Sequence, residues 1–542
     1  MVQRFMRLVA VCLVLCIVLS GCSLIDSSGR FSGLLGSITS VRYDQMQYTR
    51  PDMDEHQRIL DESCEQALVE ENLNLLLDAI MDYYEVYDSF CTNFFLAMIA
   101  YCRDTTDIYW QGEYGYCNTH AAEIDAGLDR LYRCLAKSPL RQELEGEDYF
   151  GADYFDSYEG EGLYDETFTA LLSQEAALVN SYFAISSQAN AVEYYSEDYF
   201  SIYGSQMAQV FLELVQLRQQ IATYAGYTEY TQFAYDFYHV RDYTPEQATA
   251  YLADVRAELV PLYRRLSDSD VWSQGSALSL EADTFHYVQS MANAMGGKVK
   301  DAFQAMNRQN LYDISYGQNK QGTSFTVYLR DYQLPYLFVT PTLTQYDCLS
   351  FAHEFGHFCN EYVSYGSMVG VDVAEIFSMS MEYLSLCYAE SGDALTRLKM
   401  ADSLNTFITQ AAFASFEHQL YSLSGDDLTV EGIQQLYTRV CTAYGLDVQG
   451  WDSREYVCIP HFVESPMYII SYVVSNDVAL QVYQKEQQQT GAGLSIIQDN
   501  LGSSDAYLLT FVTNAGLESP FDQGRLLQVR QTLEKALEAY LN

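Results

Sequence analysis

Residues 350–358 read Ser-Phe-Ala-His-Glu-Phe-Gly-His-Phe and contain the motif H-E-x-x-H. On a helix, side chains four positions apart share a face, so His353 and His357 can both reach one metal ion. Glu354 lies beside that face, where it can take a proton from a metal-bound water. The alternative is two core histidines on a helix. Because the chain has only eight histidines, this spacing is rarely expected by chance, and we favour the metal site.

The metal that suits this pattern best is zinc, which favours imidazole and carboxylate ligands and needs no redox chemistry. A catalytic zinc needs a third protein ligand, for which Glu375 is the candidate. Asp372 can cap the start of a helix, which places Glu375 in its first turn. Ser378 and Glu382 follow on the same face and can hydrogen-bond the ligands. From the spacing alone, a solvated carboxylate at a helix start is an equally good interpretation of Glu375.

Two stretches of the sequence resemble one family of enzymes. The His-Glu-Phe-Gly-His run, followed by D-x-x-E-x-x-S-x-x-x-E at residues 372–382, is similar to the thimet oligopeptidase / oligoendopeptidase F family of zinc metallopeptidases. Residues 459–472 read Ile-Pro-His-Phe-Val-Glu-Ser-Pro-Met-Tyr-Ile-Ile-Ser-Tyr. They resemble the family's later His-and-Tyr segment, especially in the oligoendopeptidase F branch. The resemblance covers about residues 226–542.

The resemblance implies a mostly all-α protein with two helical lobes around a deep substrate channel and a small antiparallel β-sheet beside the active site. It also implies a zinc-dependent endopeptidase that binds one Zn2+ per chain and hydrolyses short, unfolded peptides. In this interpretation Glu354 is the general base. The candidate donors to the oxyanion are His461, Tyr472 and Tyr468. With 47 tyrosines in the chain, a packing role for either tyrosine stays open.

The composition and local patterns agree with a helical fold. Nine prolines and 31 glycines are few for 542 residues, which argues against an all-β protein. The run Thr244-Pro245-Glu246-Gln247 predicts a helix start. Short β-favouring runs at residues 311–314, 324–329 and 336–339 predict a small antiparallel sheet just before the H-E-x-x-H motif. We expect four regions: a lipoprotein signal peptide (1–21), a flexible tether (22–45), an N-terminal helical region (46–225) and a zinc peptidase catalytic region (226–542).

The N-terminus has the pattern of a bacterial lipoprotein signal. Arg4 and Arg7 precede an apolar run at residues 8–19, and Leu-Ser-Gly-Cys follows at residues 19–22. The run is short for a membrane-spanning helix, and its ending resembles a lipobox. We therefore expect a lipidated Cys22 and an extracytoplasmic protein anchored to a bacterial membrane. An ordinary signal peptide or a helical anchor is the alternative.

The charge and the cysteines narrow the range of partners. The formal net charge is -44, with 29 Lys+Arg against 73 Asp+Glu. Such a surface repels nucleic acid, so we expect no nucleic-acid partner. A highly soluble acidic surface explains this charge, and a preference for cationic peptides is a weaker alternative. Disulfides and buried thiols are equally good interpretations of the cysteines. The favoured disulfide candidates are Cys91, Cys102, Cys117 and Cys134.

Two other functions stay open at this point. One is a different H-E-x-x-H hydrolase, such as an aminopeptidase. The other is a surface lipoprotein that binds peptides without cleaving them, although pure binding needs no general base such as Glu354. The sequence indicates no oligomeric state. The remaining histidines have no partner at ligand spacing, and we expect them to be structural: His56, His120, His239, His286 and His418.

Overall fold

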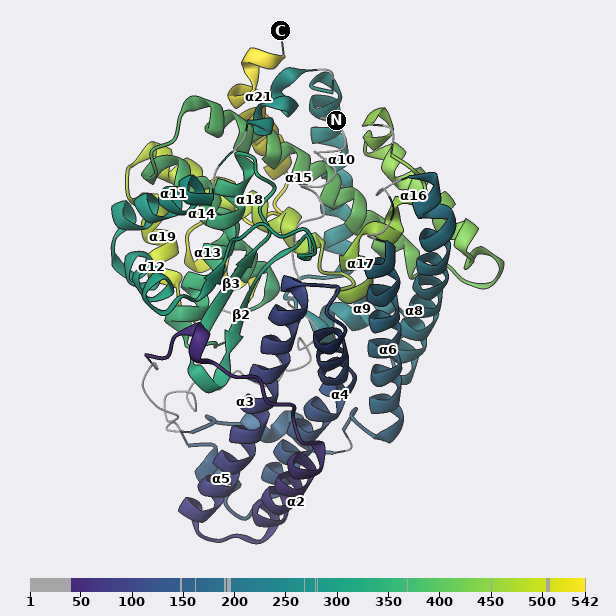
Figure 1. The fold of residues 1–542 in the computed structure, drawn as a ribbon, viewed down its shortest axis with the longest axis vertical. Coiled ribbons are helices and arrows are strands. Elements are labelled where there is room, and N and C mark those ends of the chain that lie inside the picture. The colour runs from purple at the N-terminus through teal and green to yellow at the C-terminus, as the bar shows by residue number, and fades with distance from the viewer. Residues whose placement is uncertain are drawn as a thin grey trace.

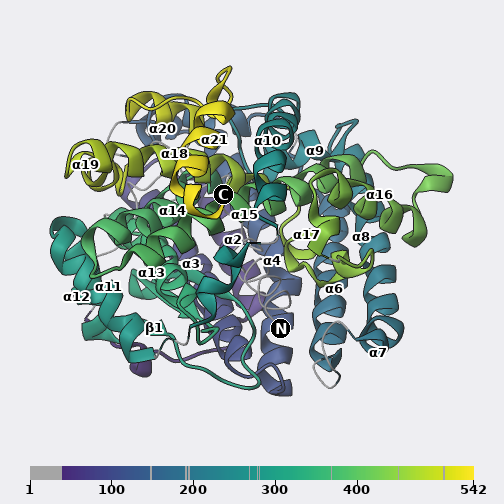
Figure 2. The ribbon, with the colours of Figure 1, turned by 90° about the horizontal axis from the view of Figure 1, so that it is seen from above.

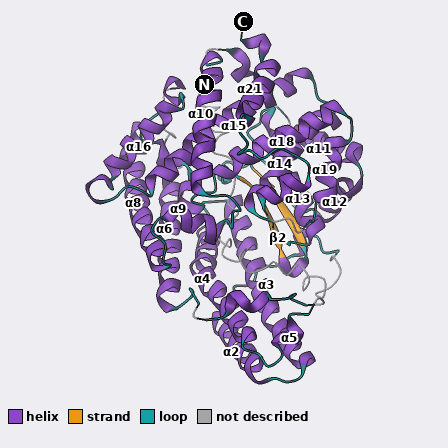
Figure 3. Cartoon of the chain, turned by 180° about the vertical axis from the view of Figure 1, so that it is seen from behind, coloured by secondary structure: helices purple, strands orange, loops and turns teal. Residues whose placement is uncertain are grey.

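The structure is a computed structural model that describes residues 40–146, 149–160, 162–189, 192, 196–267, 269–277, 279, 281–367, 369–449, 451–503 and 507–541. It is a mostly helical molecule with one small sheet, as predicted (Figures 1 and 3). The predicted signal peptide, Cys22 and the tether up to residue 39 lie outside the described residues. The last residues of the predicted tether are packed, because the ring of Tyr43 lies 4.2 Å from that of Tyr336.

The N-terminal part of the chain consists of helices, most of them long (Figure 1). They are α2 (Met53–Val69), α3 (Leu73–Arg103), α4 (Ile108–Ala136), the short α5 (Arg141–Leu144), α6 (Glu166–Ala189), the short α7 (Glu197–Tyr199) and α8 (Ser205–Tyr224). The carboxylate of Asp52 accepts hydrogen bonds from free backbone N–H groups at the start of α2. This capping fixes where the helix begins. In the described part of the chain, no helix has the length and apolar character that crossing a membrane requires.

The C-terminal part is also helical, and its central helices carry the H-E-x-x-H motif. Its helices are α9 (Tyr230–Phe233), α10 (Pro245–Arg265), α11 (Glu281–Met295), α12 (Gly297–Gln309), α13 (Tyr346–Ser364), α14 (Val371–Tyr388), α15 (Asp393–Leu420), α16 (Val430–Ala443), α17 (Pro460–Glu464), α18 (Ile470–Gln488), α19 (Ala492–Asn500), α20 (Leu508–Asn514) and α21 (Arg525–Ala536). As predicted, α10 begins with Thr244 and Gln247 in a capping box. Helix α14 packs against both α13 and α18 near the middle of the molecule (Figure 2).

The sheet lies against α13 and has the strand order β1-β3-β2. Its strands are β1 (Tyr312–Asp313), β2 (Ser324–Leu329) and β3 (Leu334–Val339). β2 and β3 pair antiparallel, with Phe325 opposite Phe338. β1 pairs parallel with β3, so the prediction of an antiparallel sheet is wrong and the sheet is mixed. The reason is that the chain crosses from β1 to the far edge before β3 fills the place between them.

A buried ammonium holds the segment that crosses from β1 to β2. Lys320 Nζ donates to Oδ1 of Asp313 at 2.9 Å. It also donates to the carbonyl oxygens of Ser315 and Val339, at 2.9 and 2.8 Å. Burial would raise the pKa of Asp313, but Lys320 and nearby hydrogen-bond donors lower it to about 2. The Asp313 carboxylate therefore stabilises the sheet in its ionised form.

We predict that Asp313→Asn removes a pH-dependent part of the stability. The folded pKa of about 2 lies below the ordinary value of about 4. The carboxylate therefore contributes fully above about pH 4, and its contribution is lost as the pH falls through about 2. Chemical unfolding at neutral pH and at about pH 3 should show that the parent loses about 1 kcal/mol more than Asp313→Asn. Equal losses in the two proteins would rule out this pairing.

Helices α13 and α14 approach each other closely at Gly356. A Cβ atom at this position would lie 2.6 Å from Cα of Ser378 and 2.8 Å from the carbonyl oxygen of Phe377. Because both neighbours are backbone atoms, they cannot move aside as a flexible side chain would. Glycine thus lets the backbone of α14 lie directly against the face of α13 that carries the histidines.

We predict that Gly356→Ala lowers the free energy of unfolding by about 1–3 kcal/mol, because the new methyl group overpacks this contact. Gly112 is a matched control, since it lies in α4 and an added Cβ atom there would have no neighbour within 4 Å. Gly112→Ala should be neutral or should stabilise by up to about 1 kcal/mol, as alanine has the higher helix propensity. Chemical denaturation measures both values. Equal stability of the two variants would show that α13 and α14 can separate without cost.

The ten cysteines among the described residues are all free thiols. They include the four favoured as disulfide candidates, which lie in α3 and α4: Cys91, Cys102, Cys117 and Cys134. Three of these four are buried in the helical core. Packing as apolar side chains accounts for them there.

Candidate active site

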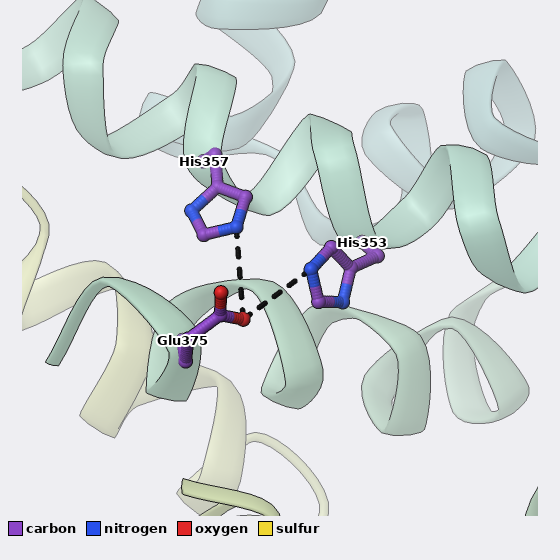
Figure 4. Close-up of side chains that lie close together, drawn as sticks. All are labelled: His353, His357 and Glu375. Atoms are coloured by element: carbon purple, nitrogen blue, oxygen red, sulfur yellow. Dashed lines mark ion pairs between the residues drawn. The ribbon is translucent and has the colours of Figure 1, made fainter. Parts of the chain in front are cut away.

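Helices α13 and α14 bring three potential metal ligands together. The Nε2 atoms of His353 and His357 lie 3.3 and 3.7 Å from Oε2 of Glu375. One ligand atom from each of the three residues lies within 4.8 Å of the other two. Figure 4 shows both imidazoles leaving one helix and pointing toward the carboxylate on the other. Two imidazoles and one carboxylate are a donor set that suits zinc.

The ring of His353 is oriented as a metal ligand would be. Its Nδ1 donates to Oε1 of Glu382 at 2.7 Å, and because a carboxylate only accepts, this bond places a proton on Nδ1. Its Nε2 is buried and makes no well-formed hydrogen bond. Burial would lower the pKa of His353, but Glu375 and Glu382 raise it to about 10. The unpartnered nitrogen therefore faces a region that attracts positive charge.

The other two candidate ligands are in the protonation states that bind metals. Burial lowers the pKa of His357 to about 4, so the ring is neutral near pH 7. Burial would raise the pKa of Glu375, but His357, His353 and Tyr468 hold it at about 2. Ser378 Oγ donates to Oε2 of Glu375 at 2.9 Å, and the Tyr468 hydroxyl donates to its Oε1. The carboxylate is thus ionised and fixed in direction.

Glu354 is fully buried beside the ligands. Thr326 of β2 lies with its Oγ1 3.1 Å from Oε2 of Glu354 and donates to it or to the Glu354 carbonyl oxygen. Oε1 of Glu354 has no hydrogen-bond partner. Burial raises the pKa of Glu354 to about 8, with His353 opposing this shift and Glu375 adding to it. A carboxyl with one free oxygen and a pKa near neutrality is suited to moving a proton.

Behind His353, a buried lysine neutralises the carboxylate of Glu382. Lys399 of α15 donates from Nζ to Oε2 of Glu382 at 2.7 Å. Asp402 lies on the other side of the ammonium, at 3.4 Å. Because Lys399 balances its charge, Glu382 can stay ionised in the core and orient the imidazole.

The three residues of the His-and-Tyr segment lie at the same site. Tyr468 reaches Glu375, while His461 Nε2 and the Tyr472 hydroxyl are hydrogen-bonded at 3.2 Å. The centroids of the three rings lie 5.3 to 6.2 Å apart. Burial lowers the pKa of His461 to about 4, so this imidazole is also neutral near pH 7. The site thus has a cluster of neutral polar groups next to the ligands.

Buried side chains hold the segment between His461 and Tyr468, residues 462–467, which is called the loop below. Arg218 of α8 donates to the carbonyl oxygens of residues 462 and 463 and pairs with Glu175 at 2.5 Å. His239 donates from Nε2 to the carbonyl oxygen of Pro466 at 2.9 Å. Each bond satisfies a loop carbonyl that is away from water. The loop is therefore fixed by residues from the N-terminal helices as well as from the C-terminal part.

One residue of this loop has an unusual backbone. Met467 has a φ of 66°, which is uncommon for a residue other than glycine. Its N–H donates to Oε1 of the buried Glu417 of α15 at 2.8 Å. This bond compensates for the strained turn, and Tyr468 follows immediately on the side that reaches Glu375.

Asp372 does not have the predicted place. Helix α14 begins at Val371 with Gly370 as its N-cap, so Asp372 lies inside the first turn and caps nothing. Its carboxylate accepts from the hydroxyl of Tyr243 at 3.3 Å and lies 3.5 Å from Arg241. Asp372 thus anchors the start of α14 and acts on Glu375 only through the helix. Ser378 and Glu382, by contrast, do contact the ligands, as expected.

The sequence motifs do not point to Thr326, Lys399 or Glu417. Thr326 stands between two apolar residues of a predicted strand, which is a weak signal for a polar group on a buried face. Lys399 and Glu417 are single charges within the long α15. Charged residues on a helix usually face solvent, so nothing local reveals that these two are buried.

Comparisons with known proteins agree with this fold. Residues 43–161 match the family described as "Peptidase M3 N-terminal domain". No curated protein matches the sequence. A solved structure named as an oligoendopeptidase F is 20% identical, with a TM-score of 0.79 over 92% of this chain and 99% of that chain. PZ peptidase A with an inhibitor is 18% identical, with a TM-score of 0.76 over 92% and 99%.

A structure named as an oligoendopeptidase F from Bacillus anthracis strain Ames is 19% identical, with a TM-score of 0.74 over 92% of this chain and 98% of that chain. At these identities the structures establish the fold, and the family match covers the N-terminal helices. The fold that the resemblance predicts is thus confirmed: the chain has the fold of oligoendopeptidase F structures, and residues 43–161 match the model of the peptidase M3 N-terminal domain.

Proposed function

We propose that this protein is a zinc-dependent endopeptidase that hydrolyses short, unfolded peptides. The observation that carries this proposal is the convergence of His353, His357 and Glu375 within 4.8 Å, beside a buried carboxyl with a free oxygen, that of Glu354. Neither feature is needed for packing, and buried unpartnered polar groups cost stability. A bound metal and a reaction would explain why these buried groups lie together.

The metal ligands of the proposed site are His353, His357 and Glu375. Zinc bound there would act as a Lewis acid on the scissile carbonyl and would lower the pKa of a water molecule. Glu382 and Ser378 hold the ligands in direction through the bonds described above. Such outer partners keep the ligand atoms aimed at the ion.

Glu354 is the proposed general base. Its free Oε1 accepts a proton from the attacking water and passes it to the leaving amine. Thr326 holds the other side of the carboxyl, so the proton is exchanged at one defined atom. The pKa of Glu354 is about 8 without a cation; a metal held by the neighbouring ligands would lower it, because a nearby cation favours the charged form of a carboxyl.

Tyr468, Tyr472 and His461 are the proposed donors to the oxyanion that forms during hydrolysis. Their neutral O–H and N–H groups can point at developing negative charge without a cost of reorganisation. Tyr468 already donates a hydrogen bond to Glu375, one of the candidate ligands. The Tyr472 hydroxyl is hydrogen-bonded to His461. Both pairs lie in the proposed catalytic region 226–542.

The peptide itself is proposed to lie along β2. This strand is at the edge of the described sheet, and Thr326 in it touches Glu354. A peptide that adds as a further strand there would pass directly by the general base. Such binding needs an extended backbone, and the channel that the family resemblance implies would admit only short, unfolded chains.

We also propose that the protein is anchored outside the cytoplasm through a lipidated Cys22. The Leu-Ser-Gly-Cys sequence after a short apolar run supports this, because a cysteine at this place in a secretory signal is the acceptor of lipid chains. Replacing Cys22 by alanine should release the protein from the membrane fraction.

Two rival functions are separated by simple measurements. An aminopeptidase requires a free amino terminus, so cleavage of an acetylated peptide at an internal bond would exclude it. A peptide-binding lipoprotein would retain peptides without turnover, so its peptides would be recovered intact. The neutral buried groups proposed as oxyanion donors and the free oxygen of Glu354 favour hydrolysis over binding without cleavage.

We predict that Glu354→Gln keeps zinc and peptide affinity but lowers kcat by about 10²–10⁴-fold, because the amide cannot take a proton. A matched control is Glu390→Gln, which makes the same change at an exposed position just after α14 and should leave kcat as it is. Mass spectrometry of an acetylated peptide mixture measures turnover. Parent-like turnover by Glu354→Gln would eliminate Glu354 as the base.

We predict that Glu375→Ala lowers zinc affinity by roughly tenfold or more, since even outer partners of a ligand are worth that much. Glu390→Ala is the control, as it removes an exposed carboxylate close in sequence to α14. Elemental analysis after dialysis against a chelator gives the zinc content of each protein. An unchanged zinc content in Glu375→Ala would remove Glu375 from the site.

A further inference from the structure

A cavity of about 90 Å³ lies beside the loop that carries the oxyanion donors. It is lined on one side by helices α4, α6 and α8 and on the other by residues 464–466. Among its polar lining residues are Asn118, Asp125, Glu175, Arg218, His239 and Glu464. The cavity thus lies where the N-terminal helices meet the catalytic part.

Several buried acceptors in this cavity have no partner. Oε2 of Glu464, Nδ1 of His239 and Oδ1 of Asn118 make no hydrogen bond. His239 uses Nε2 to donate to a carbonyl oxygen, so its Nδ1 is left as an acceptor. Asn118 likewise uses its amide N–H on Asn180, which leaves its oxygen as an acceptor. Ser465 Oγ is also unpartnered and can act in either sense.

The positively charged side chain in the lining, that of Arg218, already has partners. Arg218 pairs with Glu175 at 2.5 Å and donates to two loop carbonyls. Glu464, which is 8% exposed, has no cation against it. Burial raises the pKa of Glu464 well above its ordinary value, as happens when a carboxyl lacks a compensating charge. The cavity therefore offers several acceptors and an unbalanced carboxyl, and lacks a matching donor.

The cavity shares structural elements with the proposed active site. Glu464 follows His461 by one helical turn on α17, and residues three apart on a helix are neighbours on its surface. His239 lies with its ring centroid 6.2 Å from that of Tyr468. A substrate group in the cavity would therefore lie next to the segment that carries His461 and Tyr468.

We propose that this cavity is a substrate subsite for a positively charged group, either a lysine or arginine side chain or the free amino terminus of the peptide. An ammonium group has three donors and a guanidinium has five, and such groups suit a lining that contains the unpartnered acceptors of Glu464, His239 and Asn118. This inference rests on the proposed peptidase function and adds the class of substrate. It also gives a local cause for selecting cationic peptides.

The test uses internally quenched peptides that differ at one position at a time, with lysine or the uncharged norleucine at that position. Each peptide is made with a free and with an acetylated amino terminus. At one position, the full-length protein should prefer lysine by roughly tenfold in kcat/KM, as a buried charged hydrogen bond is worth about that much. A preference for the free amino terminus alone would assign the subsite to that group.

Glu464→Gln should lower this preference several-fold, because the amide cannot balance a cation. The control Glu431→Gln removes the same charge from an exposed position on α16 and should keep the preference. A second measurement needs no variant: n-butylamine should inhibit cleavage of the lysine peptide competitively, and n-butanol should not.

The outcomes are distinguishable. Equal cleavage of lysine and norleucine peptides at every position, with either amino terminus, would overturn the subsite while leaving the peptidase proposal intact. The subsite would likewise be overturned if Glu464→Gln keeps the full preference for lysine or if n-butylamine does not compete with the lysine peptide. Failure to cleave any peptide in the library would instead count against the proposed function and, with it, the subsite that rests on it.

Discussion

The close contact between α13 and α14 is the constraint on which the rest of the site depends. At Gly356 the absence of a side chain lets one helix lie against the backbone of the other at Ser378. This contact carries Glu375 to within 3.3 Å of His353 and 3.7 Å of His357. A shift of one turn in either helix would separate the carboxylate from both rings. The mixed sheet also packs on α13, which places Thr326 against Glu354.

Electrostatics explains why this arrangement suits a cation. Three carboxyl groups, those of Glu354, Glu375 and Glu382, are buried in one small volume; Lys399 balances Glu382, while the histidines and Tyr468 hold Glu375 ionised. Burial raises the pKa of Glu354 to about 8, so ionising this carboxyl costs free energy unless a further positive charge lies beside it. A divalent ion between the rings would offset that cost, because binding free energy to a folded site is also folding free energy. The same reasoning applies on a smaller scale to the cavity at Glu464.

The sequence could predict the part of the site whose residues lie close together along the chain. His353, Glu354 and His357 lie on one helix, so their relation follows from helical periodicity alone. Helical spacing left Glu375 equally well explained as a ligand or as a solvated carboxylate, and the rings at 461, 468 and 472 were reached only through the family resemblance, because these positions depend on how separate helices pack. The parallel pairing of β1 was missed, since local patterns do not reveal strand order. Glu417 and Glu464 look like ordinary surface carboxylates in sequence, and only the packing of distant helices around them shows that they are buried.

The most direct test of the central claim is X-ray absorption spectroscopy at the zinc edge on the purified full-length protein. The account predicts a first shell of nitrogen and oxygen at about 2.0–2.2 Å, with the scattering pattern of two imidazoles. The absence of bound zinc, or a shell containing sulfur at about 2.3 Å, would contradict it. Either result would mean that the ion does not lie between His353, His357 and Glu375.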